Sequence, residues 1–145
     1  RCPMPFHLDQ FLPYRLSVAA TEISRRFAAR YAAEAGLSIP EWRVLAHLGH
    51  SGAVSVRDIT QRVHLDKSVV SRAASRLQEA GWVAKSDHGG DRRLIVLELT
   101  QLGQELMERL SAIADEFQDE LRALLGEDAP AFERGLARIT GPERG

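Results

Sequence analysis

Apolar side chains recur every three or four residues over two long stretches, one near each end of the chain. This spacing predicts one helix over residues 8–35 and another over residues 101–125. Pro13 falls in the first turns of the earlier helix, where a missing N–H is best tolerated, and Gly36 follows as a natural stop. Thr100 is the expected cap of the later helix.

Shorter helical patterns fill the middle of the chain. Ser38 and Glu41 are spaced as a capping box, so a helix is expected from there to about residue 49. Ser55 is the expected cap of a short helix, which a turn over residues 63–66 joins to a further helix over residues 67–80. Two short helices joined by a tight turn are typical of a helix-turn-helix.

The apolar pattern then changes from helical to alternating. Residues 82–85 and 94–99 are predicted strands, and the polar, Gly-rich loop between them indicates a β-hairpin. Residues 53–55 are expected to pair as a small additional strand. A hairpin that directly follows a helix-turn-helix predicts a winged helix, so the expected fold class is mainly α with a small β wing.

The two end regions are expected to act together. Residues 8–37 and 101–140, which include a last helix beginning near Pro130, carry apolar faces more than sixty residues apart and bracket the predicted winged helix-turn-helix domain, residues 38–100. A single chain would leave much of these faces exposed, whereas the same helices of a second chain would bury them. We therefore expect a homodimer joined by long N- and C-terminal helices, with packing inside one chain as the alternative.

Charge is distributed unevenly along the chain. The formal net charge is −1, which by itself argues weakly against binding to nucleic acid. Residues 57–93, however, hold eight Lys or Arg and five Asp or Glu, a net charge of +3, whereas the rest of the chain carries −4. A basic middle between acidic ends is consistent with phosphate contacts confined to the predicted winged helix.

The predicted helix over residues 67–80 has two contrasting faces. One is apolar, with Val70 and Leu77 among its members. The other carries short hydroxyl side chains and cations: Lys67, Ser68, Ser71, Arg72, Ser75 and Arg76. Small hydroxyls let a helix approach the floor of a DNA groove, and an arginine can span guanine O6 and N7 with two hydrogen bonds. An ordinary solvated helix face is the alternative, but the turn before this helix and the hairpin after it favour a DNA contact.

The loop of the predicted hairpin carries two arginines beside a pair of glycines. Asp91, Arg92 and Arg93 stand between that Gly-rich turn and an apolar strand. Arginines at a hairpin tip can enter a narrow, electronegative minor groove. The acid could brace one arginine while the other points outward, and the spacing does not decide which. All three residues are assigned to the DNA contact.

The stretch from Asp91 to Gly103 begins with Asp-x-Arg and ends with Leu-Thr-x-x-Gly. It resembles the wing signature of the MarR family of bacterial transcriptional regulators, and residues 65–72 and 77–83 resemble that family's recognition helix and the entry to its wing. The resemblance covers nearly the whole chain. It implies a homodimer on a pseudo-palindromic operator in double-stranded DNA, usually repressing nearby genes and released by a small ligand. It also implies that Arg93 enters the minor groove, braced by Asp91.

A finer resemblance concerns the ligand. Residues 11–16 and 39–45 are similar to segments of MarR members that respond to aromatic acids such as hydroxycinnamates or their coenzyme A thioesters. Tyr14, Arg15, Trp42 and Arg43 would supply aromatic faces and cations for a small aromatic or anionic effector. In the alternative, the aromatic rings form an interhelical core and the arginines pair with acids such as Glu41.

Other classes of function find less support. His47, His50 and His64 are too scattered to predict a metal site, and no phosphate-binding glycine loop or nucleophile motif occurs, so no cofactor and no enzyme activity are expected. The apolar runs are too short to cross a membrane. The single cysteine, Cys2, excludes a disulfide within one chain and fits a reducing cytoplasm. The alternative function is a winged-helix protein-interaction module without specific DNA binding.

Overall fold

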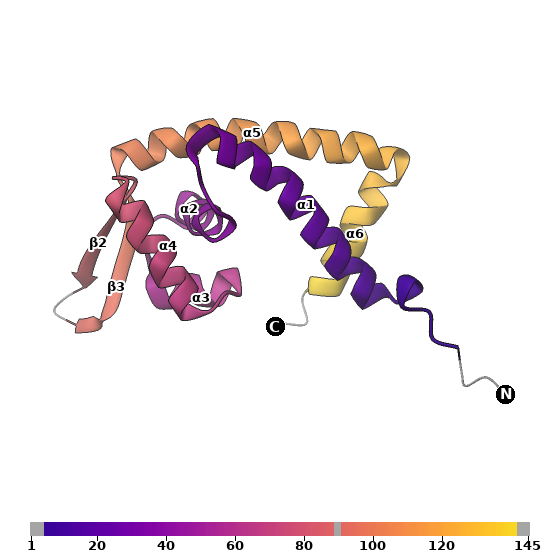
Figure 1. Ribbon diagram of the computed structural model, residues 1–145, viewed down its shortest axis with the longest axis horizontal. Coiled ribbons are helices and arrows are strands. Elements are labelled where there is room, and N and C mark those ends of the chain that lie inside the picture. The colour runs from indigo at the N-terminus through magenta and orange to yellow at the C-terminus, as the bar shows by residue number, and fades with distance from the viewer. Residues whose placement is uncertain (1–4, 89–90, 142–145) are drawn as a thin grey trace. The chain divides into compact units, whose positions relative to one another are not determined.

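The computed structural model describes residues 5–88 and 91–141, with side chains throughout except at residues 87, 88 and 91–94 (Figure 1). The predicted glycine turn at residues 89 and 90 lies outside the described residues. The chain divides into two compact units, Arg1–Leu110 and Ser111–Gly145.

The N-terminal helical region is broken near its start. A short 3₁₀ turn, η1 (Leu8–Gln10), precedes α1 (Leu12–Ala35), and Phe11 between them is extended. The single helix expected over residues 8–35 is therefore wrong in its first turn. The reason is Pro13, because its ring would clash with a helical carbonyl four residues earlier, so the helix begins at Leu12 with proline in its first turn.

The capping box predicted from the sequence is present at the start of α2 (Ile39–Ser51). The Ser38 hydroxyl accepts a hydrogen bond from the Glu41 backbone N–H at 3.3 Å, and the Ser38 backbone N–H donates to the Glu41 carboxylate at 3.0 Å. The helix then ends at Gly52, whose positive φ of 79° suits glycine. These local bonds fix where α2 begins and ends.

The helix-turn-helix follows from β1 (Val54–Ser55) through α3 (Val56–Val63) to α4 (Lys67–Glu79). Ser55 caps α3 as expected, since its hydroxyl accepts from the Asp58 backbone N–H at 3.1 Å. His64 makes the turn in the left-handed conformation, with φ 57°. Asp66 stands at the N-cap of α4, but its side chain forms no capping hydrogen bond.

The sheet has three antiparallel strands in the order β1-β3-β2. The hairpin consists of β2 (Val83–His88) and β3 (Asp91–Leu99), paired from Val83 opposite Leu99 to Asp87 opposite Ile95. The short β1 pairs with β3, with Val54 opposite Leu97. The two expected strands are present, but both extend into the predicted loop, so Asp91, Arg92 and Arg93 belong to β3. The alternation along β3 places Leu97 fully in the core and Glu98 outside.

The helices and the sheet of the first unit share one apolar core. Its fully buried members include residues of α2, α3, α4, β3 and the beginning of α5 (Gln101–Leu125), as well as Tyr31 of α1: Val44, Leu45, Leu48, Ile59, Val70, Leu77, Leu97, Leu106 and Leu110. Figure 1 shows α2, α3 and α4 gathered beside the β2–β3 hairpin. The architecture is mainly helical with a small sheet, and the predicted fold class is confirmed.

The second unit consists of the later part of α5, the 3₁₀ turn η2 (Gly126–Asp128) and α6 (Ala129–Thr140). Gly126, with φ 61°, ends α5 as expected. Arg122 on α5 donates to both carboxylate oxygens of Glu133 on α6, at 3.1 and 3.4 Å. Within the described residues, no helix is both long enough and apolar enough to cross a membrane.

Candidate nucleic-acid interface and ligand pocket

Helix α4 separates a buried apolar side from an exposed polar side. Val70, Ala73, Ala74 and Leu77 are at most 1% exposed, so they anchor the helix firmly in the core. The six residues predicted to contact DNA from this helix are all exposed: Lys67, Ser68, Ser71, Arg72, Ser75 and Arg76. We call this set the α4 polar face. It presents three cations and three hydroxyl groups on a rigid helix.

One cation of the α4 polar face has a partner in another helix. The Nε of Arg76 donates a hydrogen bond to Oε2 of Glu41, which lies in the first turn of α2. The Glu41 side chain is 9% exposed, whereas that of Arg76 is 55% exposed. Glu41, which the sequence offered as a possible partner of the ligand arginines, thus pairs with Arg76: a carboxylate already used for capping reaches across to α4.

At the tip of the wing, residues 87, 88 and 91–94 are described by their backbone alone. Strand β3 begins at Asp91, and an irregularity in pairing occurs between Asp87 and His88. The side chains of Asp91, Arg92 and Arg93 lie outside the described residues. Their assignment to the DNA contact therefore stays a prediction.

The junction between the hairpin and α5 is closed by Thr100. Its backbone N–H donates to the Trp82 carbonyl at 3.0 Å, and its hydroxyl donates to the Gly81 carbonyl at 2.6 Å. The same hydroxyl accepts from the Gly103 backbone N–H at 3.0 Å, which confirms Thr100 as the cap of α5. These bonds explain the Leu-Thr-x-x-Gly spacing, because threonine and glycine together tie the wing to the long helix.

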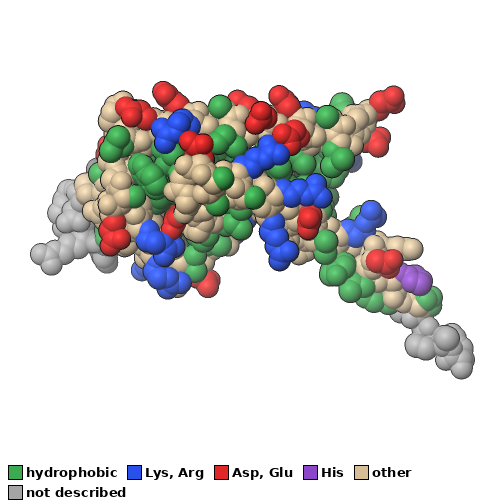
Figure 2. All heavy atoms as spheres, turned by 45° about the horizontal axis from the view of Figure 1, so that its top comes forward, with side chains coloured by type: hydrophobic (Ala, Val, Ile, Leu, Met, Phe, Trp, Pro, Cys, Tyr) green, Lys and Arg blue, Asp and Glu red, His purple; other side chains and the backbone are tan. Residues whose placement is uncertain are grey.

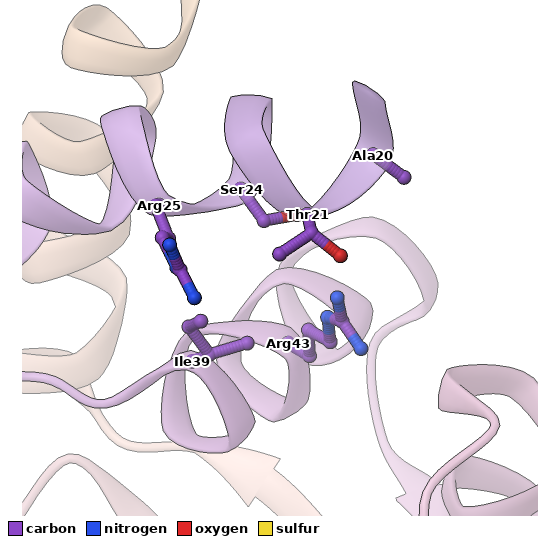
Figure 3. Close-up of a pocket in the computed structure, with 6 residues that line it drawn as sticks. All are labelled: Ala20, Thr21, Ser24, Arg25, Ile39 and Arg43. Atoms are coloured by element: carbon purple, nitrogen blue, oxygen red, sulfur yellow. The ribbon is translucent and has the colours of Figure 1, made fainter. Parts of the chain in front are cut away.

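A hollow of about 220 Å³ lies between α1 and α2. Figure 3 shows Arg25 on α1 pointing down toward Ile39, and Arg43 on α2 pointing up toward Thr21. Ala20 and Ser24 complete its lining. The hollow therefore combines two cations and two hydroxyls with apolar surface.

The four predicted ligand residues lie in three different environments. Arg43 lines the hollow, but Tyr14 and Arg15 lie on an exposed part of α1 well before its lining begins at Ala20. Arg25 is the cation that the sequence reasoning missed. The indication in the sequence is that Arg25 follows Thr21 by four residues, because side chains four residues apart lie on the same face of a helix.

Trp42 belongs to an aromatic cluster rather than to the lining of the hollow. Its ring stacks on Tyr31, with centroids 5.4 Å apart, and meets Phe27 edge-on at 5.0 Å. Tyr31 is 1% exposed, and burial raises the pKa of its hydroxyl, while the nearby Arg43 opposes this shift. For Trp42 the structure thus matches the interhelical-core alternative.

Large apolar side chains remain exposed near both ends of the described chain. In the N-terminal region these are Phe6, Leu8, Phe11, Leu12, Tyr14, Leu16 and Val18, and Figure 2 shows hydrophobic side chains gathered toward that end of α1. On α6 of the second unit they are Phe132, Leu136 and Ile139. Among the described residues, no group of three His, Cys, Asp or Glu side chains could hold a metal ion.

Comparisons with known proteins agree with this architecture. A family model described as the MarR family matches residues 35–94. The HTH-type transcriptional regulator PecS of Dickeya dadantii is 32% identical over 105 residues, which cover 62% of this chain and 63% of PecS. In PecS and two further curated relatives, the matched segment spans less than two thirds of the relative's length.

Solved structures match over nearly the whole chain. A MarR/EmrR family transcriptional regulator from Acinetobacter is 26% identical, with a TM-score of 0.80 over 93% of this chain and 95% of that one. BpsR of Bordetella bronchiseptica, whose DNA binding is regulated by 6-hydroxynicotinic acid, has a TM-score of 0.78 at 23% identity over 94% of this chain and 97% of its own. The fold and interface define a winged-helix protein with helical extensions at both ends. Residues 35–94 match the MarR family of transcriptional regulators, and a solved regulator of that family shares the fold over nearly the whole chain.

Proposed function

We propose that this protein is a DNA-binding transcriptional repressor that acts as a homodimer on a pseudo-palindromic operator and is released by a small aromatic acid. The observation that carries the proposal is the α4 polar face. Three cations and three serines stand exposed on a helix whose opposite side is buried in the core. Such a face can enter a major groove without unfavourable burial of large side chains.

Arg72 is the residue best placed to test this proposal. It lies at the exposed centre of the α4 polar face, next to Ser68 and Ser75 by helical spacing. Replacing it by alanine should lower affinity for the preferred sequence by about 1–3 kcal/mol, more than it lowers affinity for unrelated DNA. The measurement is fluorescence anisotropy with DNA from the region upstream of the gene, at two salt concentrations. Arg134→Ala on α6 is the matched control.

Two outcomes separate this proposal from a protein-interaction module. A DNA-binding regulator shows a sequence preference and a steep loss of affinity with salt. An interaction module shows neither, so the absence of a preference at micromolar protein would contradict DNA regulation.

The homodimer is supported by the exposed apolar side chains at both ends of the chain. Leu12 is 63% exposed and Ile139 is 59% exposed, although each is large and apolar. Exposed apolar side chains of this kind are buried in stable assemblies. Leu12→Glu should therefore shift the molecular mass measured by light scattering from that of two chains toward that of one. Gln61→Glu adds the same charge at an exposed position of α3 and should leave the mass unchanged. A wild-type mass of one chain would contradict the dimer.

The effector is proposed to bind in the α1–α2 hollow. Arg25 and Arg43 face the hollow from opposite walls, so a carboxylate can be held between them while the ring contacts Ile39. The volume of about 220 Å³ lies below the roughly 300–1,000 Å³ typical of drug-sized ligands, which favours a single-ring acid over a coenzyme A thioester. Regulation of BpsR by a hydroxylated aromatic acid supports the same chemistry.

A thermal-shift panel of benzoate, 4-hydroxybenzoate, cinnamate and 6-hydroxynicotinate tests the hollow, because a ligand that binds only the folded state raises the melting temperature. Arg43→Gln should weaken the best binder roughly 10- to 100-fold, the effect of losing one charged hydrogen bond. Arg26→Gln is the control, since Arg26 pairs with Glu22 at 3.6 Å outside the hollow. Equal weakening in both variants would contradict the assignment.

A further inference from the structure

The Glu41 carboxylate has two hydrogen-bond partners, one at the N-cap of its own helix α2 and one on α4. Its Oε1 accepts the Ser38 backbone N–H in the capping box of α2, and its Oε2 accepts the Nε–H of Arg76 on α4. The residue is 7% exposed overall, although it is charged. Glutamates are rarely buried unless they are paired, so the second partner accounts for its position.

The geometry of this pair leaves the outer part of Arg76 accessible. Glu41 holds the guanidinium through Nε, the nitrogen nearest the chain, and 55% of the Arg76 side chain stays exposed. The terminal nitrogens form the fork that recognises guanine O6 and N7. An arginine held at Nε can therefore present its fork in a fixed direction from the α4 polar face.

The carboxylate also offsets the charge of the arginine. An unpaired arginine on a DNA-binding surface attracts phosphates of any sequence. An arginine beside a buried carboxylate contributes less to this non-specific attraction, but it still donates directed hydrogen bonds. The pair thus favours recognition of a base over recognition of the backbone.

We propose that Glu41 is a specificity-determining positioning residue, which fixes Arg76 so that its guanidinium contacts a guanine in the operator. The proposal rests on the DNA-binding function inferred above. A residue of α2 would thus contribute to recognition although it does not belong to the α4 polar face.

The principal test is Glu41→Gln, which keeps the size of the side chain and an oxygen that can accept from Ser38. Affinity for the preferred DNA sequence should fall about three- to tenfold, as expected when one long side chain loses its fixed orientation. Affinity for unrelated DNA should stay the same or rise, because the surface gains one net positive charge. A purely structural defect would instead lower both affinities together.

Further variants keep the proposal falsifiable if Glu41→Gln folds poorly. Arg76→Lys retains the charge on an exposed side chain but lacks both Nε and the fork, so it should show the same loss of preference. In an Arg76→Ala background, Glu41→Gln should cause no further loss of preference. Glu34→Gln is the matched control, because Glu34 accepts from Nε of Arg109 at 3.0 Å on other helices of the same unit and should leave DNA binding unchanged.

A measurement without DNA distinguishes failure of this inference from failure of the proposed function. In the nitrogen-15 NMR spectrum, the Arg76 Nε–H should exchange slowly with water in the parent protein and rapidly in Glu41→Gln. If the parent binds no preferred DNA, the DNA-binding function fails and this role for Glu41 fails with it, even where the NMR signal confirms the pair. If the parent shows a preference but Glu41→Gln keeps it or binds more tightly, only the positioning role is overturned.

Discussion

Replacing Gly103 by alanine is the sharpest test of the junction between the wing and α5. A Cβ added at this position would lie 2.1 Å from the Trp82 carbonyl oxygen and 3.3 Å from Cδ2 of Leu99. The oxygen belongs to the backbone, and the same carbonyl accepts the Thr100 N–H, so it cannot move aside without loss of that bond. The substitution therefore strains the connection itself.

The expected change in stability follows from three contributions. Overpacking costs about 1–3 kcal/mol, and a weakened hydrogen bond between Thr100 and Trp82 costs about 0.5–1.5 kcal/mol. Alanine offsets about 1 kcal/mol of this cost, because it has a higher helix propensity than glycine. The free energy of unfolding should fall by about 2 kcal/mol, which corresponds to roughly 4–8 °C in melting temperature for a chain of this length.

Gly135 offers a matched control, because it also lies in a helix but an added Cβ would meet nothing within 4 Å. Gly135→Ala should be neutral or stabilising by up to about 1 kcal/mol. Urea unfolding of both variants, followed by circular dichroism at one fixed protein concentration, measures the difference. If Gly103→Ala were as stable as Gly135→Ala, the proposed steric role of Gly103 would be refuted.

Three further predictions concern a cap, a histidine and an ion pair. Ser38→Ala removes the hydroxyl half of the capping box and should cost about 1 kcal/mol in urea unfolding, whereas an unchanged midpoint would contradict the cap's contribution. Burial, assisted by Arg62 and His50, lowers the pKa of His47 below its ordinary 6.5. The contribution of neutral His47 to stability is therefore complete above pH 6.5 and is lost as pH falls through the lower, folded-state pKa. His47→Gln should reduce the dependence of the melting temperature on pH between pH 7 and 5, and an unaltered slope would count against this burial effect. Glu133→Gln breaks an exposed, solvent-screened ion pair and should leave the urea-unfolding midpoint essentially unchanged, so a clear loss would show that the pair is more than a surface contact.

Local signals in the sequence determined most of the fold. The capping box at Ser38, the cap at Ser55 and the cap at Thr100 each depend on residues three positions apart, and all three occur as expected. The buried and exposed sides of α4 follow from helical periodicity alone. Such features can be recognised because the interacting groups are close along the chain.

Tertiary structure decided which distant residues meet. Glu41 and Arg76 are 35 positions apart, and neither spacing nor composition indicates that α2 and α4 bring them together. Arg25 enters the hollow, while Tyr14 and Arg15 do not line it, because the packing of α1 against α2 selects which stretch of α1 faces Arg43. The sequence alone determined the helices, their caps and their faces, since these depend on neighbouring residues. Only the packing of those helices determined the partner of Arg76 and the composition of the hollow.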